Sequence, residues 1–275
     1  MAEDLHLDCI IIGAGISGID AAYHLNEYSG WASYTILERR PNIGGTWDFF
    51  QYPGIRSDSD MYTFGFSWKI WKSSVPIASK EAIIDYLKEA ANEQGIMEKI
   101  NFNTDVKSAI WSSNDKKWHL TTTTGIQYSC NMLFGCTGYY SYEKAYQPTF
   151  KGENDFSGKI VHPQNWTIDD DKFIVDKKIA IIGSGATAVT LLPNIANVAE
   201  HVTMIQRTPS YIGANPTVDK ISKWCIENLP MRLALFLNRW RVILIGFLFF
   251  HFCVKFPGRA KKLIKGATKK QLKGV

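Results

Sequence analysis

The chain carries two glycine-rich stretches whose residue types and spacing are typical of dinucleotide binding. In the first, an apolar run leads into Gly13-x-Gly15-x-x-Gly18. Gly13 permits a sharp turn, Gly15 lets a pyrophosphate approach the backbone, and Gly18 lets the next helix lie close to the strand. The N-terminus of that helix then faces the phosphate charge. Glu38 follows Gly18 by twenty residues, where a carboxylate accepts hydrogen bonds from the hydroxyls of an adenosine ribose.

The second glycine-rich stretch has the same layout but a different charge after its second strand. It contains Gly183, Gly185 and Ala188, and the strand that follows ends in Gln206 and Arg207 where the first unit has its acid. A guanidinium in place of a carboxylate favours the 2′-phosphate of NADPH over NADH. The alternative is that Arg207 is only a solvated surface charge. Two sites of different polarity predict a hydride acceptor, FAD, at the first and a hydride donor, NADPH, at the second.

A third stretch, FSGKIVHPQNW, lies between the two glycine-rich units. It places Phe156, Gly158, His162 and Trp166 at a spacing that fits neither a helix nor a strand. Taken alone, the histidine and the tryptophan are most simply core residues.

Residues 39–64 are dense in glycine, aromatic and acidic residues and directly follow the first nucleotide unit. Gly44 and the glycine after it permit close approach of the backbone, and Trp47 offers a flat surface. Arg56 and Asp58 place opposite charges near one another. The segment indicates a cofactor-facing loop, and an ordinary loop with a buried tryptophan is the alternative.

The elements around these motifs indicate an α/β fold with two Rossmann-like dinucleotide-binding domains, the second incomplete. Residues 80–96 have apolar side chains at helical spacing and stop at Gly95. Residues 100–140 contain short strands in hairpins and then an apolar strand that ends at Cys136. The expected domains are an FAD-binding domain at 1–150, a linker at 151–175, a partial NADPH-binding domain at 176–228, and an apolar helix with a basic tail at 229–275.

Composition indicates a folded chain in a reducing compartment. The 275 residues are 45% hydrophobic, and the five cysteines show no CxxC pair and no metal-like spacing with histidine. We therefore expect a cytoplasmic location, free thiols and no metal site. The N-terminal residues carry acids before an apolar run, which is typical of a first strand and not of a signal peptide.

The basic charge is concentrated at the C-terminal end. Eight of the 31 Lys and Arg residues lie in 255–275, which has no acid, so the rest of the chain has more acids than bases. This distribution gives no support to nucleic-acid binding. Just before it, Val242–Val254 predicts a helix of about 20 Å, shorter than a ~30 Å hydrocarbon core. His251 within this helix is more simply a packed core residue than a ligand.

Three interpretations stay open for residues 240–275. The apolar helix is buried against a further domain, or it lies peripherally on a membrane with its basic tail on anionic lipid, or it spans the membrane.

Together, the two glycine motifs, GGTW, YPGIRSD, CTGYY and FSGKIVHPQNW resemble class B flavoprotein monooxygenases, the flavin-containing and Baeyer–Villiger group. The similarity runs through roughly residues 5–215. Trp166 at the end of the third stretch favours the Baeyer–Villiger side. Several of these stretches are most similar to the bacterial ketone and thioamide oxidisers typified by the ethionamide-activating monooxygenase.

The resemblance implies roles for individual residues. The residues implied to contact the pyrophosphate and ribose of FAD are Gly13, Gly15, Gly18 and Glu38. Those implied to contact its flavin half are Thr46, Trp47, Asp58, Tyr62 and Val106. The loop at the nicotinamide end comprises Arg56, Ser57 and Asp58. The residues implied to contact the phosphates of NADPH are Gly183, Ser184, Gly185, Ala186, Thr187, Ala188, Val189, Arg207 and Thr208.

The third stretch is, by the resemblance, the linker between the FAD and NADPH domains. NADPH must first reduce the flavin, and NADP⁺ must then shift and shield it. Such a connector needs a glycine where the chain bends, a histidine whose ring bonds the backbone, and a tryptophan that packs against one domain. His162 is therefore expected to take part in catalysis, as a gating residue.

The implied chemistry is the oxygenation of a small-molecule substrate by O₂. In the family a C4a-peroxyflavin converts ketones to esters or oxidises sulfur and nitrogen centres. Asp58 would orient an arginine that keeps the peroxide anionic. That arginine, the later strand that returns to FAD, and the substrate lid have no match before Val275, so we expect weak FAD binding and little oxygenation by this chain alone.

Two alternatives remain. One is a nucleotide-binding fragment without activity. The other is a pyridine nucleotide–disulfide reductase, which also has two nucleotide folds but needs a redox cysteine pair beside the flavin. Cys130 and Cys136 are the candidates for that pair.

Overall fold

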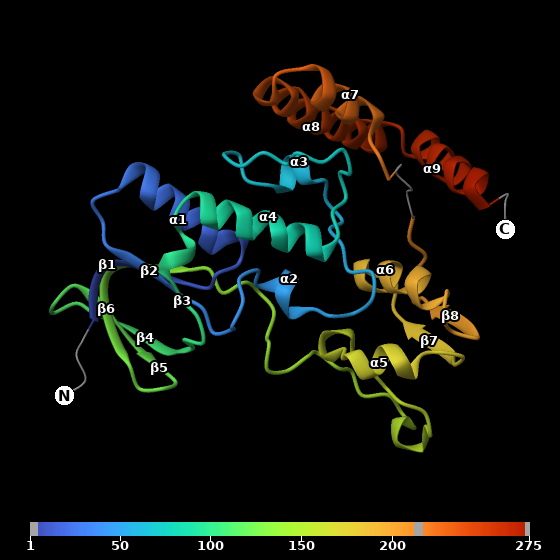
Figure 1. The fold of residues 1–275 in the computed structure, drawn as a ribbon. Coiled ribbons are helices and arrows are strands. Elements are labelled where there is room, and N and C mark those ends of the chain that lie inside the picture. The colour runs from blue at the N-terminus through green and yellow to red at the C-terminus, as the bar shows by residue number, and fades with distance from the viewer. Residues whose placement is uncertain (1–4, 212–216, 273–275) are drawn as a thin grey trace. The chain divides into compact units, whose positions relative to one another are not determined.

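The computed structural model describes residues 5–211 and 217–272, which form two compact units (Figure 1). The N-terminal unit consists of residues 1–52 and 80–167, and the C-terminal unit of residues 53–79 and 168–275. The domain boundaries predicted from the sequence remain predictions, because those domains are defined by the cofactor that each would bind, whereas the two units are defined by packing.

The N-terminal unit is built on a six-stranded sheet with the order β3-β2-β1-β6-β5-β4. Its strands are β1 (Leu5–Ile12), β2 (Tyr34–Leu37), β3 (Ile100–Asn101), β4 (Val106–Ser112), β5 (Lys117–Thr122) and β6 (Gln127–Gly135). The first three strands and β6 run parallel, whereas β4, β5 and β6 form an antiparallel meander. The central strands are rich in buried aliphatic residues, as expected for parallel strands that are covered on both faces.

Helices connect and cover the parallel strands, because a parallel connection requires a crossover. α1 (Ile16–Tyr28) links β1 to β2, and α4 (Lys80–Glu93) precedes β3. The predicted helix at 80–96 is therefore confirmed, and Gly95 follows it with a φ of 62°. The short helices of this unit are α2 (Thr46–Phe49), η1 (Met97–Lys99), η2 (Glu153–Asp155) and η3 (Pro163–Asn165).

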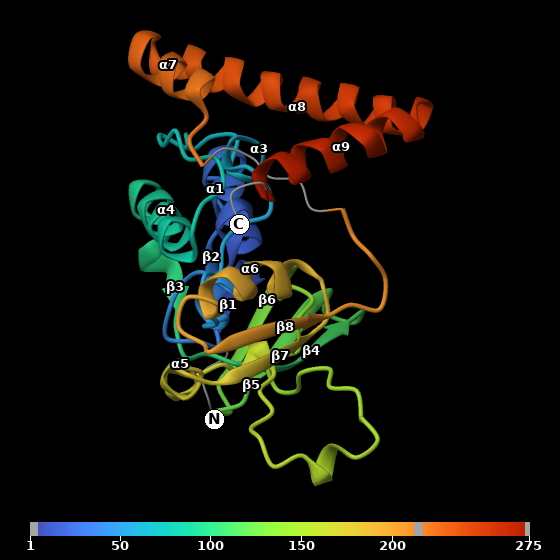
Figure 2. The same cartoon turned by 90° about the vertical axis from the view of Figure 1, so that its right-hand side faces the viewer.

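The C-terminal unit contains a second strand–helix–strand element. β7 (Lys178–Ile182) and β8 (His201–Ile205) pair in parallel, and α6 (Ala186–Ile195) makes the connection (Figure 2). α5 (Ile168–Phe173) precedes β7. This arrangement is half of a Rossmann-like unit, as the sequence predicts.

The remaining helices of the C-terminal unit are α3 (Met61–Phe64), α7 (Lys220–Asn228), α8 (Met231–Lys255) and α9 (Pro257–Leu272). The helix predicted at Val242–Val254 is correct in type but wrong in extent, because α8 has 25 residues. The prediction covered only the uncharged apolar run. In the structure Arg239 and Arg241 also lie inside the helix, where they bind groups of the neighbouring α3 and α7 regions.

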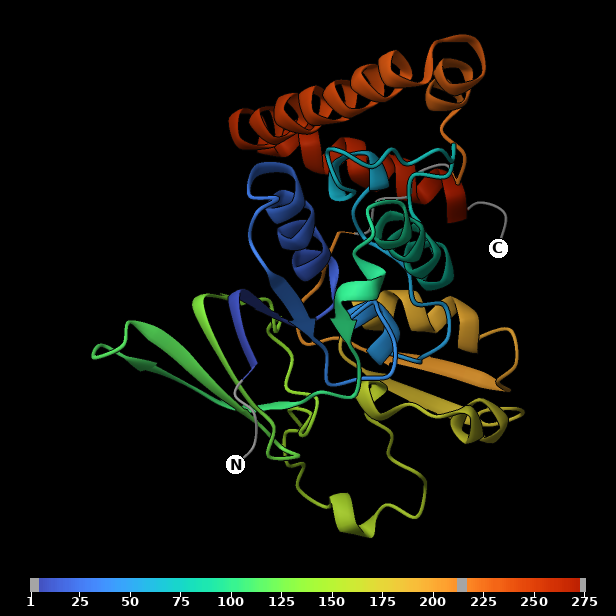
Figure 3. The same cartoon turned by 60° about the vertical axis from the view of Figure 1, so that its left-hand side comes forward.

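Within the N-terminal unit, α1 and α4 lie side by side over one face of the sheet (Figure 3). The glycine motif occupies the turn between β1 and α1, at the carboxyl end of the parallel strands. This edge is where open α/β sheets bind their ligands.

Candidate dinucleotide-binding sites

The turn after β1 can be built only with glycine at its first position. Gly13 has a φ of 103°, and a Cβ atom there would lie 2.5 Å from the carbonyl oxygen of Cys136. The Gly13 N–H donates to the carbonyl of Leu37 over 2.9 Å. The backbone of β1 thus turns tightly against the end of β6, which a side chain would prevent.

The other two glycines of the first motif differ in what they contact. A Cβ atom on Gly18 would lie 1.9 Å from the carbonyl oxygen of Gly13, so α1 can pack against the loop only with glycine there. A Cβ atom on Gly15 would instead meet Gly45 Cα at 3.6 Å, an ordinary contact. The fold itself therefore does not require glycine at position 15. Close approach of a phosphate to this backbone would require it.

The N-terminus of α1 is open to an anion. Within the described residues no side chain caps α1, and its first turn contains no acid. The unpaired N–H groups of the first turn carry partial positive charge, which favours a phosphate. α6 in the C-terminal unit shares these features, with Gly185 at its N-cap.

Glu38 closes the first glycine loop from the end of β2. Its side chain is only 3% exposed. One carboxylate oxygen accepts from the Ala14 N–H at 2.7 Å, and the other accepts from the Arg40 N–H at 2.9 Å. A carboxylate has about four acceptor positions, so two positions remain for ribose hydroxyls. The residues of the first motif and this acid are thus brought together as predicted, and they fit an adenosine dinucleotide.

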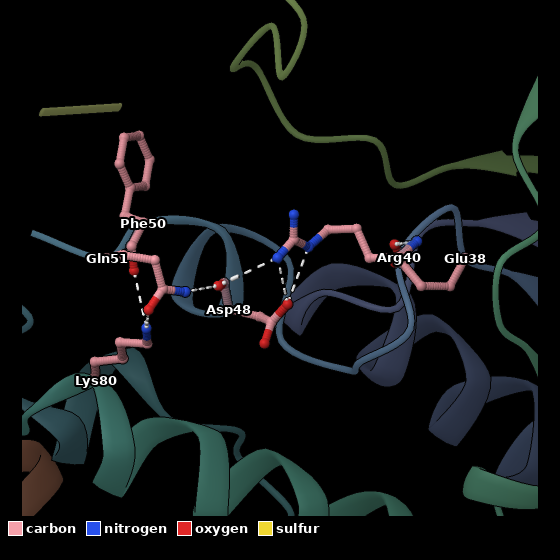
Figure 4. Close-up of polar contacts among 6 residues, drawn as sticks. All are labelled: Glu38, Arg40, Asp48, Phe50, Gln51 and Lys80. Atoms are coloured by element: carbon pink, nitrogen blue, oxygen red, sulfur yellow. Dashed lines mark hydrogen bonds and ion pairs between the residues drawn. The ribbon is translucent and has the colours of Figure 1, made fainter. Parts of the chain in front are cut away.

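A clamp of charged and aromatic residues, which the sequence did not reveal, holds α2 in place. Arg40 donates to the Asp48 carboxylate from Nε at 2.9 Å and from Nη2 at 2.7 Å (Figure 4). Its guanidinium lies 5.3 Å from the centroid of the Phe49 ring. Tyr142 stacks on Phe49 with ring centroids 4.1 Å apart. Burial, with the charge of Glu38, raises the pKa of Tyr142.

Lys80 closes the other end of α2. Its Nζ donates to the Phe50 carbonyl at 3.0 Å and to Gln51 Oε1 at 2.6 Å, as Figure 4 shows. Burial lowers its pKa. The predicted flavin contacts Thr46 and Trp47 lie on α2 between these anchors and are half-buried.

Val106, another predicted flavin contact, lies at the start of β4. It is half-buried and packs against the core cluster that contains Ile10 and Leu37. The pairing of β4 with β5 shifts register between Val106 and Ser108.

Four of the residues predicted to contact the flavin or the nicotinamide end lie in residues 53–79 of the C-terminal unit. Arg56 and Asp58 are exposed, and Arg56 forms an isolated antiparallel bridge with Ser79. Ser57 is buried, and its hydroxyl donates to the Ser59 carbonyl at 2.7 Å. Tyr62 is buried and donates to the Ser73 carbonyl at 2.9 Å, and burial raises its pKa.

The second glycine loop has the backbone of the first but fewer close neighbours. Gly183 has a φ of 119°, and its N–H donates to the Ile205 carbonyl at 2.9 Å. Cβ atoms on Gly183 and Gly185 would meet nothing within 4 Å, and Ala188 takes the third position as a buried residue. The remaining predicted phosphate contacts lie in the turn, in the first turns of α6 or just after β8. They are Ser184, Ala186, Thr187, Val189, Arg207 and Thr208.

Arg207 and Thr208 are exposed just after β8. An exposed guanidinium at this position is available to a 2′-phosphate, and it is equally compatible with a solvated surface charge.

The histidine of the third stretch bonds the backbone. His162 Nδ1 accepts from the Gln164 N–H at 3.1 Å, so in the neutral ring the proton lies on Nε2. Gln164 in turn donates to the Ser141 carbonyl at 2.6 Å. Trp166 is buried, and a Cβ atom on Gly158 would lie 2.4 Å from the exposed Phe156 ring.

The cysteines do not form a redox pair. All five lie in described residues and are free. Cys130 is in β6 and Cys136 directly follows that strand, so about 20 Å of extended chain separates them, well beyond the ~7 Å between Cα atoms that a disulfide tolerates. Burial raises the pKa of Cys130 to about 11 and also raises that of Cys136. Neither thiol is prepared for thiolate chemistry.

Comparison with known proteins identifies the family. Residues 10–233 match the family described as pyridine nucleotide-disulphide oxidoreductase. The chain belongs to this family. Its disulfide chemistry has no support in the cysteines described above, and the curated relatives are monooxygenases. The chain is 46% identical over 271 residues to "FAD-containing monooxygenase EthA" of Mycolicibacterium smegmatis, which covers 97% of this chain and 55% of the relative.

A further curated relative and two solved structures are also similar to this chain. "Probable FAD-binding monooxygenase AlmA" of Acinetobacter baylyi is 43% identical, with 98% of this chain and 55% of the relative covered. The solved structure "Oxidized steroid monooxygenase bound to NADP" superposes with a TM-score of 0.68 at 28% identity, over 81% of this chain and 43% of that one. Cyclohexanone monooxygenase from Rhodococcus sp. Phi1 bound to NADP⁺ gives 0.65 at 26% identity, over 77% and 40%.

These relatives confirm the predicted resemblance to flavoprotein monooxygenases and the predicted fold class. The chain spans about half the length of the curated relatives it matches.

Proposed function

We propose that this chain is the cofactor-binding part of an FAD- and NADPH-dependent monooxygenase that oxygenates ketones, or sulfur and nitrogen centres, with O₂. The observation that carries the proposal is buried Glu38. Its carboxylate ties the glycine loop to β2 and keeps two acceptor positions beside the open N-terminus of α1. The names of the curated relatives support FAD, and the solved structures bound to NADP support NADPH.

FAD would be held at the first glycine loop. Gly15 gives the pyrophosphate its approach to the backbone, and Glu38 accepts from the ribose. The flavin half would lie toward α2, where Arg40 and its clamp fix the positions of Thr46 and Trp47. Asp58, Tyr62 and Val106 complete the proposed contacts. When bound, FAD supplies the two-electron chemistry through which a nicotinamide reductant is coupled to O₂.

NADPH would be held at the second glycine loop. Gly183 and Gly185 leave the backbone open, because their Cβ positions meet nothing within 4 Å. The first turn of α6 offers N–H groups to the phosphates. Arg207 and Thr208 would bind the 2′-phosphate, and exposed Arg207 has the charge that this group requires.

Asp58 and His162 are proposed to act on the reaction. Asp58 and its exposed neighbour Arg56 would face the nicotinamide end of NADPH. His162 would fix the linker between the two cofactor sites, since its ring already holds the backbone of Gln164. When it covers the reacting groups, a linker held in this way would exclude water from them.

The proposed partners are a small-molecule substrate and O₂, without nucleic acid. A peripheral contact with a membrane through residues 240–275 is also proposed, on the cytoplasmic side, where free thiols persist.

The test uses the purified 275-residue chain. In a titration with FAD, the protein is expected to bind the flavin, followed by the change in flavin fluorescence, and NADPH is then expected to bleach the flavin absorbance in the absence of O₂. The variant Glu38→Gln is the matched control, because it keeps the side-chain shape but places an N–H₂ group against an N–H donor. A wild-type protein that binds no FAD in the titration would overturn the proposal, and so would a variant that binds FAD as tightly as the wild type.

A further inference from the structure

The long helix α8 has two halves with different surroundings. In the first half, Arg239 donates to the Tyr62 carbonyl at 3.3 Å. Arg241 donates to the Asp219 carboxylate and to the Ser222 hydroxyl, the latter at 3.0 Å. Burial alone would raise the pKa of Asp219, but hydrogen bonds from Arg241 and from the Ser222 N–H lower it below its usual range. The first half of α8 is therefore held within its own unit.

The second half of α8 is apolar and open. Residues 242–254 contain no charged side chain. Its exposed apolar residues, each between 41 and 64% exposed, are Ile243, Leu244, Ile245, Phe247, Leu248, Phe249, Phe250 and Val254. Proteins that stay free in water rarely expose an apolar surface of this extent. The segment therefore requires an apolar partner.

α9 adds a strong positive charge directly after this segment. It folds back at an angle from the far end of α8 (Figure 2). Ala260, Leu263, Ile264 and Ala267 lie on one side of α9, at the spacing of a single helical stripe. The basic residues of α9 are Arg259, Lys261, Lys262, Lys265, Lys269 and Lys270, and it has no acid. Lys273 lies outside the described residues.

We infer that the second half of α8 and α9 together form a peripheral anchor for an anionic lipid bilayer. The apolar segment 242–254 enters one leaflet, and the lysines of α9 lie among anionic headgroups. This inference deepens the membrane contact proposed above and does not depend on flavin binding.

Length and charge decide against a spanning helix and against a second copy of the chain. Among the described residues, α8 is the helix long and apolar enough to cross a membrane, and 11% of its most apolar window is buried. Arg239 and Arg241, however, bind the protein, so about 20 Å of uncharged helix remains for a ~30 Å hydrocarbon core. A second copy of the chain would bring another α9 of the same charge against the first. An anionic bilayer offers an apolar interior to residues 242–254 and negatively charged headgroups to the lysines of α9.

The experiment is sedimentation of the full chain with phosphatidylcholine vesicles, with and without phosphatidylserine. Binding is expected only with phosphatidylserine, and it should weaken in 1 M salt, where the Debye length falls to about 3 Å. Each basic residue near an anionic surface contributes about fivefold. The variant K261E/K262E/K265E should therefore bind at least ~100-fold more weakly.

A second variant tests the apolar segment. L248E/F250E replaces two exposed side chains, and it should also weaken binding at least ~100-fold, because each buried apolar side chain contributes about tenfold or more. The matched controls are K88E/K144E/K151E and Y28E/W31E, which change exposed residues of the N-terminal unit and should bind as the wild type does. Circular dichroism verifies that every variant folds.

Three results would overturn the inference. Equal sedimentation with both vesicle compositions would remove the role of α9. Self-association that L248E/F250E abolishes, without vesicle binding by the wild type, would assign the surface to a second copy. Protection of α9 from trypsin inside sealed vesicles would show a spanning helix. Flavin absorbance is measured on the same samples, so failure of the anchor is distinguished from failure of the proposed function.

Discussion

Replacing Gly15 by alanine separates cofactor binding from folding. Gly15 has a φ of −80°, which any residue adopts, and its Cβ would lie 3.6 Å from Gly45 Cα, an ordinary contact. Alanine reduces the conformational entropy of the unfolded chain, which stabilises the fold by about 0.4–1 kcal/mol. Alanine is also a poorer N-cap than glycine, which destabilises the fold by a similar amount. The free energy of unfolding should therefore change by less than about 1 kcal/mol, a shift in Tm of at most ~4 °C.

FAD affinity should respond differently. The new methyl group lies where a pyrophosphate must approach the backbone at the N-terminus of α1. One extra methyl group in a close-packed contact costs about 1–3 kcal/mol, which weakens FAD binding about 5- to 150-fold. Gly185→Ala is the matched control, because its Cβ meets nothing within 4 Å. It should weaken NADPH binding and leave FAD binding unchanged.

The assay is titration of the flavin-free protein with FAD and NADPH, followed by flavin fluorescence and calorimetry, with Tm measured in parallel. If Gly15→Ala binds FAD as tightly as the wild type, the dinucleotide does not approach position 15 and the assignment of the first loop is wrong. A loss of folding would refute the steric reasoning instead.

Three further predictions test other parts of the chain. Gly18→Ala should destabilise the fold by about 1–3 kcal/mol in chemical denaturation, because its Cβ would lie 1.9 Å from the Gly13 carbonyl oxygen; a loss below this range would show that α1 can shift. Arg207→Ala should weaken NADPH binding about 10- to 150-fold without affecting NADH or Tm, since it removes one charge-assisted bond; equal losses for both nucleotides would leave Arg207 as a surface charge. The pKa of Asp219 is lowered in the folded state. Its contribution to the free energy of unfolding, about 1.5–3 kcal/mol, is therefore present above its unfolded pKa and is lost as pH falls through its folded-state pKa. Asp219→Asn should therefore flatten the acid limb of the stability curve, and an unchanged limb would contradict the role of the Arg241 bond.

The parts of the site that follow from local backbone geometry were predictable from the sequence. Gly13 and Gly183 both have the positive φ that the motif implies, and Glu38 lies at the end of its strand, against the loop. Each of these features depends on a few neighbouring residues and a regular strand or helix, which is why spacing alone finds them.

Features that depend on distant side chains were not predictable in this way. Arg40, Asp48 and Tyr142 meet only because the fold returns residue 142 to α2. The extent of α8 was wrong for a related reason: Arg239 and Arg241 end an apolar run in the sequence, but tertiary partners accept their charges within a continuous helix. Such partners cannot be read from hydrophobic periodicity.

The division into two units has a consequence for dissecting the protein. Residues 53–79 leave the N-terminal unit and pack with residues 168–275, so the backbone passes between the units three times. A single proteolytic cut cannot release either unit intact. A fragment that ends near residue 167 would also expose Met61, Tyr62 and Trp71, which are buried in the whole chain. Separate expression of the flavin half would therefore succeed only after this excursion is replaced by a short polar loop.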